Sequence, residues 1–169
     1  NTSTYTFYST LPGTINYSGS CDSDNNTALA DNNTVTFDAL PDGTHSNCKI
    51  SVTSNGVVSD NLSVTQFIID TTAPILDNVT NVPTPTSDNT PDYTFSSNEA
   101  GTITYGGACG SSSSSSASSG DNNTVTLTQP DNSTPLNDGT YDNCTITVTD
   151  NASNTSDNLT VSEFTIGAT

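Results

Sequence analysis

The 169-residue chain has very few basic residues: one lysine and no arginine stand against 18 aspartates and glutamates, for a formal net charge of −17. Such a charge repels nucleic-acid phosphates and anionic membrane surfaces, so the composition excludes nucleic acid as a partner. No apolar run approaches the ~20 residues that a membrane-spanning helix needs. We therefore expect a strongly acidic protein without membrane insertion.

Helix-forming residues are also scarce, because the chain has no methionine, one lysine and only two glutamates. Threonine, serine and asparagine are abundant instead, with 32, 25 and 21 residues, and these residues favour strands and turns. Only 30% of the residues are hydrophobic, a value that suggests disorder where the apolar residues show no period. Here they alternate with polar residues, which predicts folded β-strands.

The chain lacks most of the side chains that enzyme active sites use. His45 is the only histidine, so a Ser-His-Asp or Cys-His site would have to include it, and no residue pattern around it supports that role. Paired carboxylates of the glycosidase type remain an alternative, but the acidic residues fall in turns and aromatic residues make up only 7% of the chain. We expect no enzymatic activity.

The chain has four cysteines, Cys21, Cys48, Cys109 and Cys144, and no C-x-x-C pair. This number and spacing favour two disulfides over a zinc site. Disulfides persist in oxidising compartments. The cysteines therefore predict an extracellular or cell-surface protein.

The most informative feature is an internal duplication. The stretches that begin at Asn1 and Gly13 recur at Asn89 and Gly101, an offset of 88 residues that increases to 97 towards the C-terminal end. The increases fall in loops. The serine-rich segment 111–119 is a low-complexity insert, which we expect to be a flexible surface loop. Two homologous modules follow, residues 1–70 and 71–169. Residues 71–80 have no counterpart in module one, which predicts that module one lacks its N-terminal strand.

Period-2 alternation places one apolar face on each strand of both modules and leaves the other face to threonine and serine. Two such sheets would pack as a small β-sandwich. In module two the alternation predicts strands near residues 75–80, 91–97, 101–106, 123–128, 144–149 and 157–166. The predicted core contains Tyr5, Phe7, Ile15, Tyr17, Val35, Phe37, Ile50, Val52, Leu62 and Val64 in module one, and Tyr93, Phe95, Ile103, Tyr105, Val125, Leu127, Ile146, Val148, Leu159 and Val161 in module two.

Strand number and cysteine placement resemble an immunoglobulin-like (Ig-like) sandwich with strands A to G. In that topology strands C and F are antiparallel neighbours, which implies a Cys109–Cys144 disulfide and an equivalent Cys21–Cys48 disulfide in module one. The resemblance gives module one strands B to G and module two strands A to G. The segment Asp138-Gly-Thr-Tyr141 resembles a tyrosine corner, and we expect His45 to replace that tyrosine in module one.

The chain also resembles the tandem Ig-like repeats of very large bacterial extracellular and surface proteins, adhesins among them. The resemblance rests on Ile69-Asp-Thr-Thr-Ala-Pro, on 83–95 (PTPTSDNTPDYTF), on 98–105 (NEAGTITY) and on 138–144 (DGTYDNC). It implies a non-enzymatic structural module of a surface stalk, adhesin or fibre, whose partners are neighbouring Ig-like modules.

Four residues form a candidate calcium site. In a sandwich the start of strand A, the B–C loop and the F–G loop lie at one pole, which would bring together Asp70, Glu99, and Asp150 with Asn151. Oxygen ligands from separate segments suit a hard cation at extracellular calcium concentrations. At the corresponding positions of module one, Leu11 and Ser54 replace Glu99 and Asp150, so only one complete set exists. Calcium is the only cofactor that we expect.

Two other functions remain open. Because module one lacks strand A, a strand from another copy of the chain could complete it, giving a head-to-tail filament by donor-strand complementation. The loops could alternatively bind a glycan or a receptor, although few aromatic residues are left to stack on sugar.

Overall fold

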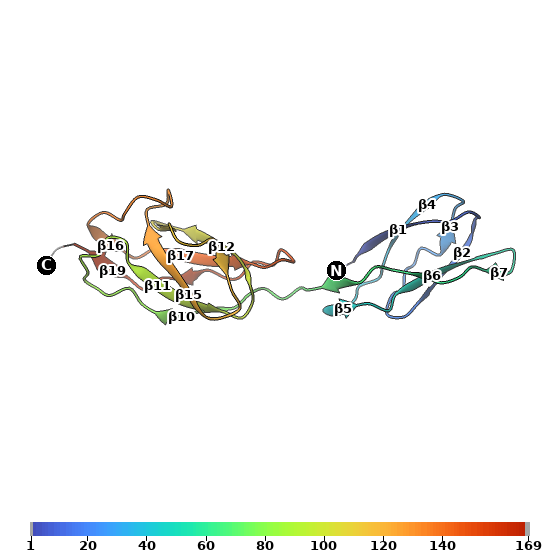
Figure 1. The fold of residues 1–169 in the computed structure, drawn as a ribbon, viewed down its shortest axis with the longest axis horizontal. Coiled ribbons are helices and arrows are strands. Elements are labelled where there is room, and N and C mark those ends of the chain that lie inside the picture. Colours follow the sequence, from blue (N-terminus) through green and yellow to red (C-terminus); the bar gives the residue numbers. More distant parts are fainter. Residues whose placement is uncertain (1, 168–169) are drawn as a thin grey trace. The chain divides into compact units, whose positions relative to one another are not determined.

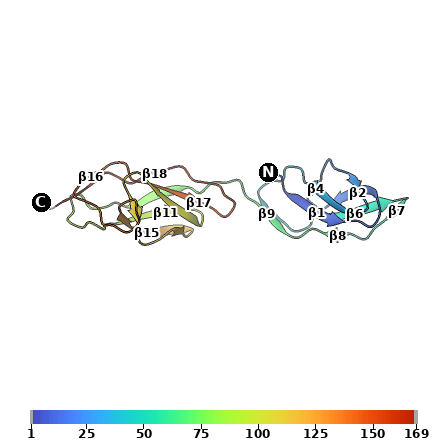
Figure 2. The same ribbon diagram turned by 90° about the horizontal axis from the view of Figure 1, so that it is seen from above.

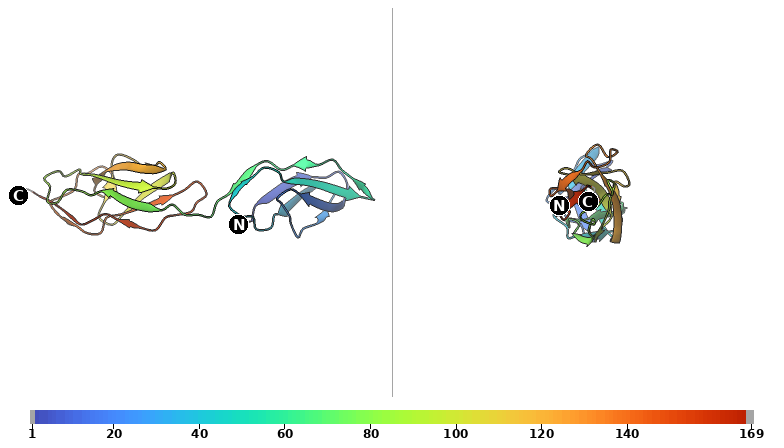
Figure 3. Two further views of the ribbon diagram at one scale, coloured as in Figure 1. Left: turned by 90° about the horizontal axis from the view of Figure 1, so that it is seen from below. Right: turned by 90° about the vertical axis from the view of Figure 1, so that its left-hand side faces the viewer.

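The computed structural model describes residues 2–167, the side chain of residue 121 excepted. Every regular element in this range is a β-strand, which confirms the all-β class (Figure 1). Figure 3 likewise shows strands and no coiled ribbon in the coloured part of the chain. Within these residues no helix is long and apolar enough to cross a bilayer.

The chain divides into two compact units, unit 1 (Asn1–Thr71) and unit 2 (Thr72–Thr169). This boundary lies one residue from the predicted one. Residue 1, where predicted module one begins, and residues 168–169, where predicted module two ends, lie outside the described residues.

Unit 2 contains two antiparallel four-stranded sheets, with strand orders β10-β11-β15-β13 and β14-β12-β17-β18, and a separate pair, β16-β19. Strand β12, which precedes Cys109, and strand β17, which follows Cys144, pair directly over five residues. The strands are β10 (Leu76–Thr80), β11 (Asp92–Ser97), β12 (Gly101–Gly106), β13 (Gly110–Ser111), β14 (Ser116–Ala117), β15 (Gly120–Thr128), β16 (Gly139–Tyr141), β17 (Thr145–Thr149), β18 (Leu159–Thr160) and β19 (Phe164–Ile166).

The core of unit 2 is one cluster to which both sheets contribute, so the unit is a β-sandwich. Alternate residues of β11 and β17 are buried, as the period-2 pattern predicts. Eight of the ten predicted core residues are buried, and Tyr105 and Leu159 are partly buried against the cluster. The predicted core omitted five further buried apolar residues: Val82, Ala117, Leu136, Phe164 and Ile166. The first three lie outside the predicted strands, and the last two lie in the predicted strand 157–166.

Unit 1 has the same central pairings with fewer strands. Its sheets are β1-β4, a five-stranded sheet with the order β3-β2-β6-β7 in which β8 also pairs with β6, and β5-β9. Figure 2 shows β1 beside β4. The strands are β1 (Thr4–Tyr8), β2 (Gly13–Ser18), β3 (Thr27–Ala28), β4 (Asn32–Thr36), β5 (Gly43–His45), β6 (Lys49–Ser54), β7 (Val57–Val58), β8 (Leu62–Ser63) and β9 (Phe67–Ile69).

The core of unit 1 is smaller and less completely covered. Six of the ten predicted residues are buried and three, Tyr5, Tyr17 and Val52, are partly buried against them. Leu62 contradicts the prediction, because 42% of it is exposed. Its equivalent in unit 2, Leu159, packs against the core.

A glycine opens strand β2 in unit 1 and strand β12 in unit 2. A Cβ atom at Gly13 or Gly101 would lie 2.3 Å from the carbonyl oxygen of Thr53 or Thr149 on the paired strand. A side chain at either position would therefore push the paired strands apart. This close approach explains why both repeats begin the strand with Gly-Thr-Ile.

The structure has disulfides Cys21–Cys48 and Cys109–Cys144, the two pairs that the Ig-like resemblance implies. Their Cα–Cα distances are 5.3 and 5.1 Å, within the usual range. Each disulfide closes a loop inside one unit. Both disulfides point to an oxidising, non-cytoplasmic compartment.

Two sequence-based predictions of local structure are wrong. The stretch 157–166 is not one strand: β18 pairs with β17, and β19 pairs with β16. The serine-rich segment is not a free loop, because it contains β13 and β14, which pair with β15 and β12. Serine hydroxyls supply part of its order, since Ser111 Oγ and Ser114 Oγ accept hydrogen bonds from the backbone N–H groups of Ser113 and Ser116.

Candidate functional site

Three acidic residues are the candidate metal ligands: Asp70 lies in unit 1, and Glu99 and Asp150 lie in unit 2. These are three of the four residues that the sequence nominated. All three offer only oxygen, which suits a hard cation such as calcium rather than zinc.

Asp150 organises the loop that follows strand β17. Its Oδ1 accepts hydrogen bonds from the backbone N–H groups of Ala152 (2.7 Å) and Asn154 (2.9 Å), and its Oδ2 accepts one from Asn154 Nδ2 (2.9 Å). Ser153, at the tip, has a φ of +72°, a value that is uncommon for residues other than glycine. The hydrogen bonds of its neighbours Ala152 and Asn154 to Asp150 stabilise this conformation. The carboxylate therefore holds the loop together with the backbone hydrogen bond from the Asp150 N–H to the Asn154 carbonyl oxygen (3.0 Å).

The same contacts set the charge of Asp150. Burial alone would raise the pKa of its carboxyl, but the hydrogen bonds from the Asn154 side chain and from the backbone of 152–154 outweigh burial and lower that pKa. Asp150 is only 8% exposed. A carboxylate held charged in this partly dehydrated position attracts a cation more strongly than an exposed one.

Glu99 lies in the turn between β11 and β12, which is fixed by Ser97. Ser97 Oγ donates to the Glu99 carbonyl oxygen (2.5 Å), and the Glu99 N–H lies 3.4 Å from Ser97 Oγ. The preceding residue, Asn98, accepts a hydrogen bond at Oδ1 from the Ile75 N–H (2.7 Å). The turn therefore holds the start of the first strand of unit 2.

Asn151, the fourth nominated residue, is exposed at the tip of the β17 loop. Unit 1 has no counterpart of this loop, because β6 and β7 are joined by a tight turn through Asn55 and Gly56, both with positive φ (50° and 80°). That Asn-Gly turn is the typical two-residue hairpin connection. This turn needs no carboxylate to hold it, which explains why unit 1 can have Ser54 where unit 2 has Asp150.

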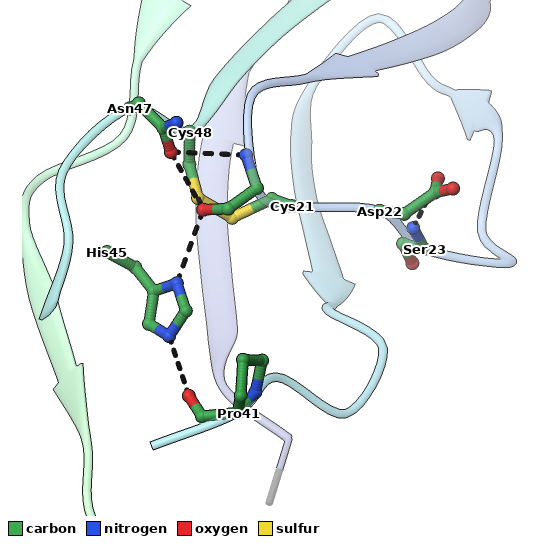
Figure 4. The surroundings of a disulfide bond; sticks show 8 residues. Cys21, Asp22, Ser23, Pro41, His45, Asn47 and Cys48 are labelled. Carbon is green, nitrogen blue, oxygen red and sulfur yellow. Dashed lines mark hydrogen bonds between the residues drawn. A yellow bond between two sulfur atoms is a disulfide. The ribbon is translucent and has the colours of Figure 1, made fainter. Parts of the chain in front are cut away.

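His45 has a structural role in unit 1. Its Nε2 lies 3.0 Å from the carbonyl oxygen of Pro41, which can only accept, so Nε2 carries the proton. Its Nδ1 lies 3.2 Å from Ser20 Oγ, beside the Cys21–Cys48 disulfide (Figure 4). The ring stacks on Phe67 with a centroid distance of 5.3 Å. Both ring nitrogens are therefore engaged in holding the fold.

Tyr141 makes the equivalent contacts in unit 2. Its hydroxyl donates to the Asn137 carbonyl oxygen (2.9 Å), four residues upstream, and its ring stacks on Phe164 at 5.2 Å. His45 thus occupies the place of Tyr141, as the sequence analysis expected.

A cavity of about 530 Å³ opens beside the serine-rich segment of unit 2. It is lined by Ser111–Ser115, by β12 residues and by Pro130 and Asn132, and Tyr105 contributes its one aromatic ring. The Tyr105 hydroxyl donates to the Ser114 carbonyl oxygen (2.5 Å). The cavity therefore presents mainly hydroxyl and backbone groups rather than a stacking platform for sugar.

No protein-family model matches the chain, and comparisons with curated proteins and with solved structures give no match either.

Proposed function

We propose that the chain is a non-enzymatic structural segment of an extracellular bacterial surface protein, a stalk, adhesin or fibre built from tandem Ig-like modules. The observation that carries the proposal is a duplicated β-sandwich whose potentially reactive side chains serve the fold. All four cysteines form disulfides, and His45 holds a corner through both ring nitrogens.

The charge supports this proposal. A net charge of −17 on 169 residues makes copies of the chain repel one another. Lateral association of neighbouring stalks would therefore be disfavoured. The disulfides add loop-closure stability, about 3.5 to 4 kcal/mol each in the chain-entropy model for separations of 27 and 35 residues.

Antibody labelling of intact cells of the producing organism tests the proposal. Surface labelling that is removed by shaving the cells with protease is the expected result. Signal that appears only after permeabilisation would contradict it. Turnover of a panel of glycoside and ester substrates by the purified chain would also contradict it.

We propose further that Asp70, Glu99 and Asp150, with Asn151, bind calcium. Three carboxylates from separate segments of the sequence would supply the oxygen-rich coordination that calcium prefers. If the site behaves like other extracellular modules, its dissociation constant should be on the order of 0.1 to 1 mM.

Thermal unfolding with added calcium tests the metal site. Because any salt screens the self-repulsion of a chain this acidic, each calcium concentration is compared with sodium chloride of equal ionic strength. We expect calcium to raise the melting temperature above the sodium control, and Glu99→Gln to remove the difference. Asp92→Asn, which changes an exposed acid on β11, is the matched control and should keep it. Equal effects of calcium and sodium would contradict the site.

A further inference from the structure

The turn between β6 and β7 contains the only asparagine of the sequence that a glycine follows. The chain has 21 asparagines, and Asn55 alone precedes a glycine, Gly56. Both residues are exposed and have positive φ values, 50° and 80°. A Cβ atom at Gly56 would meet nothing within 4 Å. Water therefore reaches this turn freely.

The reactive groups of the turn have no hydrogen-bond partner. Within residues 2–167, neither the Asn55 carboxamide nor the Gly56 N–H makes a hydrogen bond. The backbone nitrogen that follows an asparagine can attack the carboxamide carbon (Cγ) of that asparagine and close a succinimide ring. Glycine has no Cβ to hinder this approach. The Gly56 nitrogen is therefore a nucleophile that neither a hydrogen bond nor a side chain restrains.

The end of the hairpin opens at low cost, which ring closure requires because the backbone of the turn must rotate. Strand β7 consists only of Val57 and Val58, which are 72% and 60% exposed. These two residues pair with Ser54 and Thr53 of β6. A hairpin end with two residue pairs and little buried apolar surface belongs to the least stable part of a fold.

The corresponding loop of unit 2 lacks these features. Its exposed asparagine, Asn151, precedes Ala152, which has a Cβ. The Ala152 N–H donates a hydrogen bond to Asp150 Oδ1 (2.7 Å). The negative carboxylate disfavours loss of the proton from that nitrogen, and this loss must precede attack. Asn151 is therefore a natural control for Asn55 within the same chain.

We propose that Asn55 is a site of spontaneous deamidation. The Gly56 nitrogen gives up its proton and forms a bond to Asn55 Cγ, while the bond from Cγ to the carboxamide nitrogen breaks and ammonia leaves. Water then opens the succinimide at either of its carbonyl carbons. One opening gives aspartate, and the other gives isoaspartate, in which the backbone runs through Cγ. The net reaction consumes one water and releases one ammonia, with no oxidant or reductant.

Either product changes the β6–β7 hairpin. Aspartate adds a negative charge to a chain whose net charge is already −17. Isoaspartate lengthens the backbone of a two-residue turn, and the length of the turn sets the register of the paired strands. The pairing of Val57 and Val58 with β6 should therefore be lost in the isoaspartate form. The reaction needs only water, so it would proceed whether or not the chain forms part of a stalk.

Ageing of the folded, disulfide-bonded chain at mildly alkaline pH, followed by fragment-ion mass spectrometry, tests the proposal. We expect Asn55 to exchange its NH2 group for OH about tenfold faster than Asn151, or more, and to give both aspartate and isoaspartate. Gly56→Asn is the matched variant, because asparagine tolerates positive φ but adds a Cβ. It should slow the conversion of Asn55 to about the rate of Asn151.

A reduced sample in urea shows how fast Asn55 reacts when the fold does not restrain it. The proposal is overturned if Asn55 stays intact in the folded chain while it converts in urea. It is also overturned if Asn55 and Asn151 convert at equal rates in the folded chain, or if Gly56→Asn does not slow the reaction. Aspartate as the sole product would overturn it too, because direct hydrolysis without a ring gives no isoaspartate. The isoaspartate measurement uses the unaltered chain and so does not depend on how well the variant folds.

Discussion

His45 and Tyr141 hold the same corner of the two units. His45 Nε2 and the Tyr141 hydroxyl each donate a hydrogen bond to the carbonyl oxygen four residues upstream, that of Pro41 or of Asn137. Each ring also stacks on the phenylalanine of the last strand, Phe67 or Phe164. Two chemically different side chains therefore perform one structural task.

This equivalence predicts that tyrosine can replace histidine in unit 1. His45→Tyr should change the free energy of unfolding by less than about 1 kcal/mol, because the new hydroxyl can reach Pro41. His45→Ala should cost about 1 to 3 kcal/mol, since it removes a buried ring that stacks on Phe67 and its hydrogen bond to Pro41. Urea denaturation measures both. Equal losses for the two variants would contradict the shared role.

The corner could be predicted from the sequence because the duplication aligns His45 with Tyr141. The Ig-like resemblance implied the two disulfides, and the period-2 alternation predicted most of the core. The last strand could not be predicted as two pieces, because its break depends on β18 and β19 choosing different partners. The short strands of the serine-rich segment escaped prediction as well, since hydroxyl contacts such as that of Ser114 depend on tertiary position.

Of the candidate metal ligands, the sequence could nominate the acids but not the geometry of their loops. The bonding of Asp150 to Ala152 and Asn154 depends on a backbone turn that has no periodic signal. The duplication also marks two buried polar residues that the sequence analysis did not single out. Asn33 and Asn123 stand at the same place in the two repeats, and both are buried.

These two asparagines clamp the turn before a strand. Asn33 accepts from the Leu29 N–H (2.7 Å) and donates to the Leu29 carbonyl oxygen (3.0 Å), and Asn123 does the same with Ser118 (2.8 and 3.0 Å). Asn123→Ala should therefore lower the free energy of unfolding by about 1 to 3 kcal/mol. Its exposed neighbour Asn122 is the control, and Asn122→Ala should stay within about 0.5 kcal/mol. Chemical denaturation measures both, and indistinguishable variants would refute the clamp.

Unlike the two asparagines, Tyr93 is a buried polar residue without a hydrogen bond at its side chain. Its ring is fully buried and its hydroxyl has no hydrogen-bond partner. Tyr93→Phe keeps the ring and removes the unsatisfied group, so we expect it to raise the free energy of unfolding, by about 1 kcal/mol. Tyr8→Phe, at a residue that is 65% exposed, should have no effect. A destabilised Tyr93→Phe variant would show that the hydroxyl has a partner in solution.

Stability should decline at both ends of the pH scale. Burial raises the pKa of Tyr93, of Tyr17 and of Tyr105 above 10.0. Hydrogen bonds from Thr134 and Ser133 lower the pKa of Asp131 from 3.8 to about 2. A raised tyrosine pKa contributes stability that is complete below pH 10 and is lost as pH rises through the folded-state value. A lowered aspartate pKa contributes stability that is complete above pH 3.8 and is lost as pH falls towards 2.

Melting temperatures across the pH scale check this profile. We expect a plateau between about pH 5 and pH 9 and a fall on either side of it. Asp131→Asn should flatten the acid side and leave the alkaline side unchanged. An acid side that this substitution does not alter would show that other carboxyls control it.

The most direct test of a disulfide-stapled structural segment is to pull the chain from both ends in a force-extension measurement. The account predicts two separate unfolding events, one for each unit. Because the disulfides exclude 27 and 35 residues from extension, reduction should lengthen the two events by about 90 and about 120 Å, at ~3.5 Å per residue. A single event, or lengths that reductant does not change, would contradict the account.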